Sequence, residues 1–299
     1  MRVLVAGATS VPGMPVLREL AVRGHEVLGL TRNPAKKAEI ESTGAIARVV
    51  DVFDAPGIAF ALDDFAPEAV VSLLTTLPKR GPLRYRDFRP ARRLWSEGAG
   101  NLLAAAQHAG VRRFVAESVI FGYGYGPDGP PLIDESDLYP KPPPEGGEAM
   151  LAAMRGMERL VLGSGEHSGT EGIVLRYGFF YGDEVPHIQM MRRMAKWRLL
   201  PVPTGNSMLS WIHIDDVARA TADAVERGRG GELYNIVDDH PSSFGDFVRS
   251  LPGPRPLTVP RGLFALVAPY AAIAMGNTWL PLSNAKAKAE LGWTPVTRP

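Results

Sequence analysis

A short apolar run that ends in glycine opens this chain and constrains its fold most. Residues 3–6 favour a strand, Gly7 follows directly, and residues 16–23 place apolar side chains at helical spacing. Short β-branched runs and longer helix-like segments then alternate along most of the sequence. Because consecutive parallel strands need helical crossovers, this alternation predicts an α/β fold with a doubly wound parallel sheet.

The alternation also locates individual elements. We expect strands at residues 3–6, 26–31, 47–50, 69–74, 114–117, 172–176 and 233–237. A helix that begins after Pro90 should contain residues 102–108, and the segment EAMLAAMRGMERLVL predicts another helix at residues 148–162. The turn-forming residues 127–144 predict a long loop.

Two departures from the alternation divide the chain. Residues 1–182 and 210–240 are expected to form the sheet-containing domain, and residues 183–209 and 241–299 a smaller C-terminal subdomain. In the smaller part, HIQMMRRMAKWRLL predicts a basic amphipathic helix that could act as a lid. We therefore expect the smaller part to bind the substrate.

Composition excludes several classes of partner. The 33 basic and 32 acidic residues give a net charge of +1, so there is no electrostatic footprint for nucleic acid or an anionic membrane. The chain has no cysteine and no apolar run long enough to span a membrane, and we expect no signal peptide. We expect a cytoplasmic protein, monomeric or homodimeric, whose partner is a small molecule.

The glycine turn after the first strand indicates a nucleotide site. The segment VLVAGATSVPG places Gly7 and Gly13 around the turn into the first helix. Such a turn lets the backbone approach a pyrophosphate, whose charge then faces the helix N-terminus. Thr9, Ser10 and Val11 between the glycines are candidate contacts, although a glycine pair can also serve the turn alone.

Several motifs together carry a resemblance to a known family. The turn resembles the T-G-x-x-G-x-x-G of extended short-chain dehydrogenases, with Ala6 first, Ser10 in the middle and Gly13 last. GVRRFVAESVIFGYG, IVLRYGFFYGD, WIHIDDVARA, YNIVDD and the closing NAKAKAELGWTP are similar to further motifs of this family. The resemblance covers nearly the whole chain and implies a Rossmann fold with a nicotinamide dinucleotide.

The end of the second strand bears on the choice of dinucleotide. NAD sites normally offer a carboxylate to the ribose 2′-hydroxyl, whereas a 2′-phosphate attracts arginine. Arg32 stands at this position, which favours NADP or NADPH over NAD. The resemblance also implies that Asp51, Val52, Leu74 and Tyr177 contact the cofactor.

The resemblance implies a catalytic Tyr, Lys, Asn and Ser, and most of these are replaced. Aligning by Glu158 places Met150 at the tyrosine and Met154 at the lysine, while Trp95 falls at the asparagine. The serine position falls on Glu117 or Ser118. Because a hydroxyl can donate a hydrogen bond to a carbonyl and an ionised carboxylate cannot, we favour Ser118 as the catalytic residue.

The replacements suggest a substrate that supplies its own proton. A ketone beside a phenolic hydroxyl has this property, so the chain looks like an atypical NADPH-dependent ketoreductase of aromatic polyketide tailoring, with the proton coming from that hydroxyl or from water. Soft and flat side chains would line its pocket. We expect substrate contacts from Trp95, Met150, Met154, Met190, Met194 and Trp197, although methionines at helical spacing are more often core.

Other interpretations remain open at this point. The chain could bind NADP(H) without turnover as a sensor or scaffold, or act as a sugar-nucleotide epimerase or dehydratase, which Met150 argues against. Alternative acids are Tyr123, Tyr125, Tyr177, Tyr181 and His187, each more often a packing residue. His213, Asp215 and Asp216 match a structural motif of the family, and we expect no metal.

Overall fold

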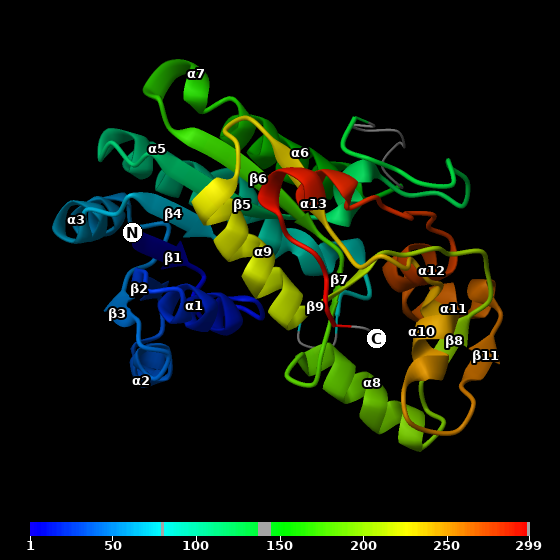
Figure 1. The fold of residues 1–299 in the computed structure, drawn as a ribbon. Helices are drawn as coiled ribbons and strands as arrows, with labels where there is room; N and C mark the ends of the chain where they lie inside the picture. Colours follow the sequence, from blue (N-terminus) through cyan, green and yellow to red (C-terminus); the bar gives the residue numbers. More distant parts are fainter. Residues whose placement is uncertain (79–80, 137–144, 298–299) are drawn as a thin grey trace.

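The computed structural model describes residues 1–78, 81–136 and 145–297 and is built around a seven-stranded sheet (Figure 1). Its strand order is β10-β6-β5-β4-β1-β2-β3, and every neighbouring pair is parallel. The strands are β1 (Arg2–Ala6), β2 (Glu26–Thr31), β3 (Ile46–Val49), β4 (Ala69–Ser72), β5 (Arg113–Val119), β6 (Glu171–Tyr177) and β10 (Leu233–Ile236). The predicted doubly wound Rossmann-type sheet is confirmed.

Helices cover both faces of this sheet. One face carries α3 (Ala55–Phe65), α4 (Arg89–Arg93), a π-helical turn (Leu94–Gly98), α5 (Ala99–His108) and α6 (Glu148–Leu162). The other carries α1 (Gly13–Val22), α2 (Lys37–Glu41), α9 (Ile214–Arg227) and α13 (Ala285–Leu291). A short helix, α7 (Gly165–Ser168), precedes β6. Each face has its own apolar cluster, as expected of a sheet buried on both sides.

A smaller part of the chain lies beyond the end of the sheet (Figure 1). It contains α8 (Pro186–Lys196), β8 (Pro201–Pro203), α10 (Phe244–Ser250), β11 (Leu257–Val259), α11 (Arg261–Val267) and α12 (Pro269–Gly276). The short strand β7 (Phe179–Tyr181) pairs with β9 (Trp211–His213) and leads into it. A third apolar cluster fills this part, where the Trp211 and Phe247 rings stack 3.8 Å apart.

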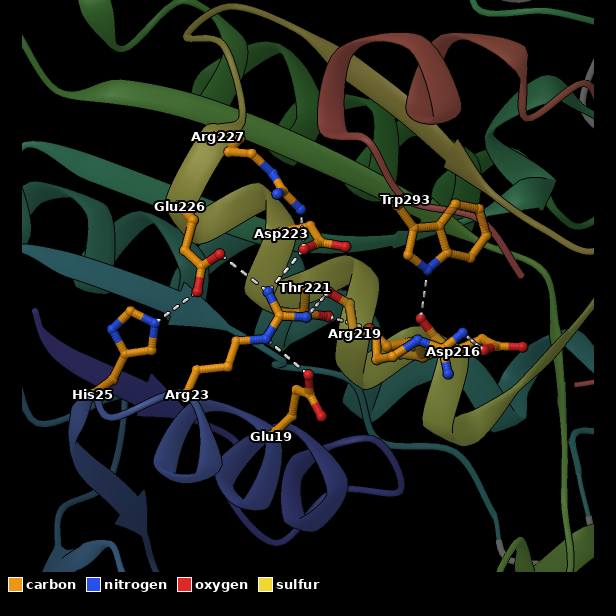
Figure 2. A network of polar contacts seen from close by, with 11 residues as sticks. Glu19, Arg23, His25, Asp216, Arg219, Thr221, Asp223, Glu226, Arg227 and Trp293 are labelled. Carbon is orange, nitrogen blue, oxygen red and sulfur yellow. Dashed lines mark hydrogen bonds and ion pairs between the residues drawn. The ribbon is translucent and has the colours of Figure 1, made fainter. Parts of the chain in front are cut away.

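The C-terminal segment returns to the main sheet instead of remaining in the smaller part. Trp293 is buried in the cluster beneath α9, and its indole Nε1 donates to the Asp216 carbonyl oxygen at 3.1 Å (Figure 2). The backbone N–H of Thr297 donates to the Asp216 carboxylate at 3.1 Å. The end of the expected subdomain of residues 241–299 thus packs with the sheet-containing part, because the apolar partners of Trp293 lie under the sheet.

Ion pairs hold α1 against α9 on that face. Arg23, just after α1, donates to Asp223 at 2.7 Å and to Glu226 at 3.1 Å, and His25 contacts Glu226 at 3.0 Å (Figure 2). Arg227 also pairs with Asp223. The helix after the glycine turn is thus fixed at its far end, which keeps the turn itself in place.

The loop predicted at residues 127–144 is described only in part, since residues 137–144 lie outside the described residues. Before them, the backbone N–H of Ile133 donates to the Pro281 carbonyl oxygen at 2.8 Å. This part of the segment is therefore tied to the chain between α12 and α13.

Candidate active site

The C-terminal edge of the sheet brings three segments to one level. Ala6 pairs with Ser72, and Ser72 pairs with Ala116, so the next residues Gly7, Leu73 and Glu117 form the following row. Ligands of open parallel sheets bind at this edge. The row therefore joins the glycine turn, the end of β4 and the C-terminal part of β5.

The glycine turn has the tight geometry that a dinucleotide requires. Gly7 has φ of 81°, and a Cβ there would overlap the Leu73 carbonyl oxygen. A Cβ on Gly13 would overlap the carbonyl oxygens of Gly7 and Ala8. Both positions therefore need glycine, the first for its backbone conformation and both for close approach.

The polar groups of the turn fit a pyrophosphate. The Ser10 hydroxyl is buried and has no hydrogen-bond partner among the residues that the structure describes. In the same described part of the chain, no side chain caps the N-terminus of α1. Thr9 and Val11 are exposed on either side of Ser10. A bound anion would supply the missing partner and face the positive end of the helix dipole.

The remaining predicted cofactor residues differ in their surroundings. Arg32 lies exposed directly after β2, while Val52 and Leu74 lie together against Gly98. Asp51, by contrast, accepts the Phe53 backbone N–H at 3.0 Å and so closes its own turn.

Tyr177 is buried, and its hydroxyl lies 2.7 Å from the Thr221 hydroxyl in α9. Burial raises the pKa of Tyr177, with a smaller contribution from Glu117. Its ring can border the site, but its hydroxyl is committed to α9.

The methionine stripe of α6 is buried in the main apolar cluster. Met150, Met154 and Met157 all face it, together with Trp95 from the π-helical turn. The Trp95 Nε1 is buried there without a partner among the described residues. Apolar groups therefore occupy the places where the resemblance implies Tyr, Lys and Asn.

The apolar residues of the predicted lid helix pack into a different apolar cluster. Helix α8 packs through Ile188, Met191 and Ala195 into the third cluster, with Met194 half-buried against it. Met190 is half-buried, and Trp197 is 77% exposed just after the helix. Trp197 follows the last residue of the helix and points to solvent, so its contact with a substrate stays a prediction.

Ser118 differs most from the expectation. Its side chain is only 1% exposed, and its hydroxyl donates to Glu158 Oε1 at 2.6 Å. Arg176 donates to the two carboxylate oxygens of Glu158 at 2.8 and 2.6 Å. Ser118 thus belongs to a buried ion-pair network between β5, β6 and α6, and its hydroxyl already has a partner within the protein.

Glu117, the neighbouring residue, has a different environment. It is 5% exposed, and its Oε2 has no hydrogen-bond partner within the described ranges. Desolvation raises the pKa of Glu117 to about 8, and the nearby Thr75 hydroxyl, although outside ordinary hydrogen-bonding geometry, lowers it slightly. The carboxyl group is therefore protonated near neutral pH.

The other acids considered from the sequence all have protein partners. Tyr123 donates to Asn235 at 2.9 Å, and Tyr181 donates to the Thr297 carbonyl oxygen at 3.2 Å. The Tyr125 hydroxyl lies 3.2 Å from that of Tyr270, and His187 Nε2 lies 3.0 Å from the Phe180 carbonyl oxygen. None of these groups matches the unpaired carboxyl oxygen of Glu117.

A cluster of aromatic rings lies just after β5, and the sequence did not predict it. Phe121 stacks on Tyr125 with ring centroids 4.6 Å apart, and the Phe179 and Tyr270 rings meet Phe121 edge-on. Tyr85, in a 3₁₀ turn, packs edge-on against Tyr270 and has a buried hydroxyl without a partner in the described chain. The FGYGYG segment was a signal for this cluster, but Tyr85 and Tyr270 lie too far away in sequence to be joined to it.

Comparison with known proteins identifies the family. Residues 3–237 match the NAD dependent epimerase/dehydratase family, and the chain belongs to it. It is 34% identical over 306 residues to a 3-diazoavenalumate denitrifying reductase of Streptomyces sp, covering 99% of this chain and 96% of that protein. It is also 28% identical over 289 residues to a 4-hydroxy-2-methyl-3-oxo-4-farnesyl-3,4-dihydroquinoline-1-oxide ketoreductase of Stigmatella aurantiaca, covering 93% and 80%. The family and these two reductases indicate an oxidoreductase.

Solved structures show the same fold. The UDP-glucose 4-epimerase of Thermus thermophilus, in complex with NAD, matches with a TM-score of 0.79 at 22% identity, covering 100% of this chain and 95% of that one. DesIV, a dTDP-glucose 4,6-dehydratase from Streptomyces venezuelae with NAD bound, matches with a TM-score of 0.79 at 22% identity, covering 100% and 93%. Identity at this level supports the fold and not the substrate.

The described residues form neither a metal-binding cluster nor a membrane-spanning helix. Within the described residues, no three His, Cys, Asp or Glu side chains are grouped so that they could hold a metal ion. His213 instead caps α9, where its Nδ1 accepts the Asp215 backbone N–H at 3.2 Å. Among those same residues, no helix combines the length and apolarity needed to cross a bilayer.

Proposed function

We propose that this protein reduces a ketone on a flat aromatic substrate of the polyketide type, with NADPH as the hydride donor. The observation that carries the proposal is the replacement of a proton relay by apolar groups: Met150, Met154 and Trp95 lie buried where the family resemblance implies Tyr, Lys and Asn. Apolar groups at these three positions favour an aromatic ring over a sugar nucleotide, which needs many hydrogen bonds.

The smaller part of the chain supports the same substrate class. Tyr270 of α12 meets Phe121 and Tyr125 edge-on, so aromatic faces from both parts converge. Aromatic pairs of this kind give favourable edge and face contacts to a further ring. We propose that the substrate binds between the sheet edge and this part of the chain.

The choice of NADPH is supported by Arg32. It is exposed directly after β2, whereas the nearby Lys36 pairs with Glu39. A hydrogen bond between charged groups contributes about 1.5–3 kcal/mol, so Arg32→Ala should raise KM for NADPH by about tenfold or more. KM for NADH should stay within about twofold. Steady-state kinetics with both cofactors test this, with Lys36→Ala as the control; equal loss for both cofactors would remove the basis for NADPH.

Turnover decides the main proposal. Purified protein should oxidise NADPH in the presence of aromatic ketones that carry a hydroxyl group beside the carbonyl, and the product should be the corresponding alcohol. Matched ketones without that hydroxyl should react more slowly if the substrate itself supplies the proton. NADPH binding without turnover across both series would favour a non-catalytic sensor instead.

A second candidate is reductive removal of nitrogen from an aryl diazonium. It is favoured by the 34% identity, over 99% of this chain, to a relative that is named as a diazo-compound denitrifying reductase. Hydride addition to the terminal nitrogen of Ar–N₂⁺ gives a neutral diazene, which becomes Ar–H and N₂ when its hydrogen moves to the ring carbon. The reaction needs no external proton and no cationic lysine, which agrees with Met150 and Met154.

The two candidates give different products from one experiment. With NADPH deuterated at the transferred position, ketone reduction places deuterium on a carbinol carbon, whereas denitrification releases N₂ and consumes one NADPH for each N₂. A panel that contains both substrate types therefore separates them.

A further inference from the structure

We propose that Glu117, and not Ser118, faces the reacting carbonyl and donates the proton to its oxygen. This inference rests on the proposed ketone reduction and names the acid that the missing tyrosine would otherwise supply. It differs from proton transfer by the substrate's own hydroxyl. The two sources make opposite predictions for a Glu117 variant.

The position of Glu117 in the sheet supports this role. Glu117 pairs with Leu175 of the neighbouring strand β6. It follows Ala116, whose pairing with Ser72 is the last pair between β5 and β4. It therefore stands at the ligand-binding edge of the sheet, in the row that begins with Gly7 of the nucleotide turn.

The surroundings of the Glu117 carboxyl group support the same role. Glu117 is more than nine-tenths buried, and its Oε2 has no partner in the described part of the chain. Buried polar groups are nearly always paired in native proteins, so an unpaired oxygen at a ligand edge calls for a ligand atom. A carbonyl oxygen that accepts the carboxylic O–H would satisfy it.

The acidity of Glu117 also suits a proton donor. The only titratable neighbour recorded for Glu117 among the described residues is Tyr177 of β6, and no cation there offsets the burial. The pKa of Glu117 is raised to about 8, whereas that of Tyr85, the competing unpaired hydroxyl, is raised to about 12. General acids work best when their pKa lies near the working pH, which favours Glu117.

The proposed step has a hydride donor and a proton donor. Bound NADPH would supply the hydride to the carbonyl carbon, so that the C=O π pair would move to the oxygen. The Glu117 O–H bond breaks as its proton passes to that oxygen, leaving an alcohol and a carboxylate. Water then returns a proton to Glu117.

The test compares three variants with wild type on a ketone that turns over. Glu117→Gln keeps the shape but cannot transfer a proton, so kcat should fall by about 10²–10⁴-fold while the NADPH dissociation constant stays within twofold. Glu135→Gln is the control, because Glu135 is a second carboxyl with a raised pKa, although it is only partly buried. Tyr85→Phe tests the competing donor. Thermal unfolding of each variant checks that it folds.

The pH profile gives a second readout. In wild type, kcat/KM should be high while Glu117 is protonated and fall as pH rises through about 8. Glu117→Gln should lose this limb. If Glu117→Gln retains wild-type turnover and the same limb, the proton comes from the substrate or water and the inference is wrong; if Tyr85→Phe shows the loss instead, Tyr85 is the donor.

Failure of the proposed function looks different. If wild type reduces no ketone but denitrifies an aryl diazonium, the ketoreductase proposal and the role of Glu117 as its acid both fall. If wild type reduces ketones and Glu117→Gln does so equally well, only the inference falls.

Discussion

At the scale of single residues, Ser118 and Glu117 are neighbours with contrasting environments. Ser118 donates to Glu158, which also holds Arg176, and all three side chains are buried. Hydrogen bonds to charged groups contribute about 1.5–3 kcal/mol, so Ser118→Ala should lower the free energy of unfolding by about that amount. Turnover should stay within about twofold of wild type because the hydroxyl does not face the substrate.

Urea denaturation and steady-state kinetics measure the two effects. Ser42→Ala is a suitable control, since Ser42 also donates its hydroxyl to one acceptor but lies exposed. Loss of turnover in Ser118→Ala with unchanged stability would restore Ser118 as a catalytic residue.

Glu117 also predicts a pH dependence of stability. Its pKa rises from 4.5 to about 8 on folding, so between these values the unfolded chain ionises while the folded protein keeps the proton. The unfolded state then binds fewer protons, and stability falls with rising pH by about 1.4 kcal/mol per unit from this one group. Glu117→Gln should therefore gain stability over wild type as pH rises.

Urea denaturation between pH 5 and 8 tests this difference. The advantage of Glu117→Gln over wild type should be small at pH 5, grow towards pH 8 and then level off. The exposed Glu184→Gln should show no such trend. A constant difference across the range would mean that Glu117 is ionised in the folded protein at neutral pH.

Sequence could narrow this position but not resolve it. The motif around β5 limited the choice to Glu117 or Ser118, and the greater donor ability of a hydroxyl favoured Ser118. That argument assumed an ionised Glu117, whereas burial at the sheet edge keeps it protonated. Burial depends on which segments pack above a strand, and sequence spacing does not carry that information.

At the scale of secondary structure, α6 offers the sharpest test of the missing proton relay. Met150→Tyr combined with Met154→Lys would restore the residue types that the family resemblance implies. Met154 is fully buried, and the nearby Glu158 is already held by Ser118 and Arg176. Burying a further ammonium costs several kcal/mol, so the double variant should be less stable and no faster.

Thermal unfolding and NADPH turnover measure this outcome. Met157→Leu is the control, because a volume-conserving change in the same stripe usually costs less than about 1.5 kcal/mol. A large gain in rate at unchanged stability would show that the pocket lacks an acid and that neither Glu117 nor the substrate supplies one.

Elements with a strong local pattern were predictable. Residues 26–31 and 148–162 were predicted with the bounds of β2 and α6, since each has a clear period and clear ends. The three-residue strands β7, β8 and β9 were not, because they are defined by partners and not by local pattern. The lid helix was predicted, but its apolar face packs inward on Met191, which leaves Trp197 in solvent.

At the scale of the whole molecule, the chain closes on itself through Trp293. Sequence marked this residue as part of a family-like tail but assigned it to the smaller part. In the structure it fills the cluster under α9 and donates to Asp216. The tail therefore joins the end of the chain to the helix that α1 also contacts, so that the glycine turn, the sheet and the terminus share one core.

The packing of Trp293 predicts a large loss of stability when this residue, which lies far from the candidate active site, is removed. Trp293 is 1% exposed, and removing a buried tryptophan costs about 3–5 kcal/mol, so Trp293→Ala should destabilise the fold by that amount. Trp197→Ala, which removes an exposed ring, should change stability by less than about 0.5 kcal/mol. Urea denaturation followed by circular dichroism measures both. Trp293 shares its apolar cluster with Val3, Val5 and Ala8 around the first strand, so we expect it to support the nucleotide site only through this common core. The NADPH affinity of Trp293→Ala should therefore fall only in parallel with the folded fraction. A loss of affinity in fully folded Trp293→Ala would show that the tail shapes the nucleotide site directly.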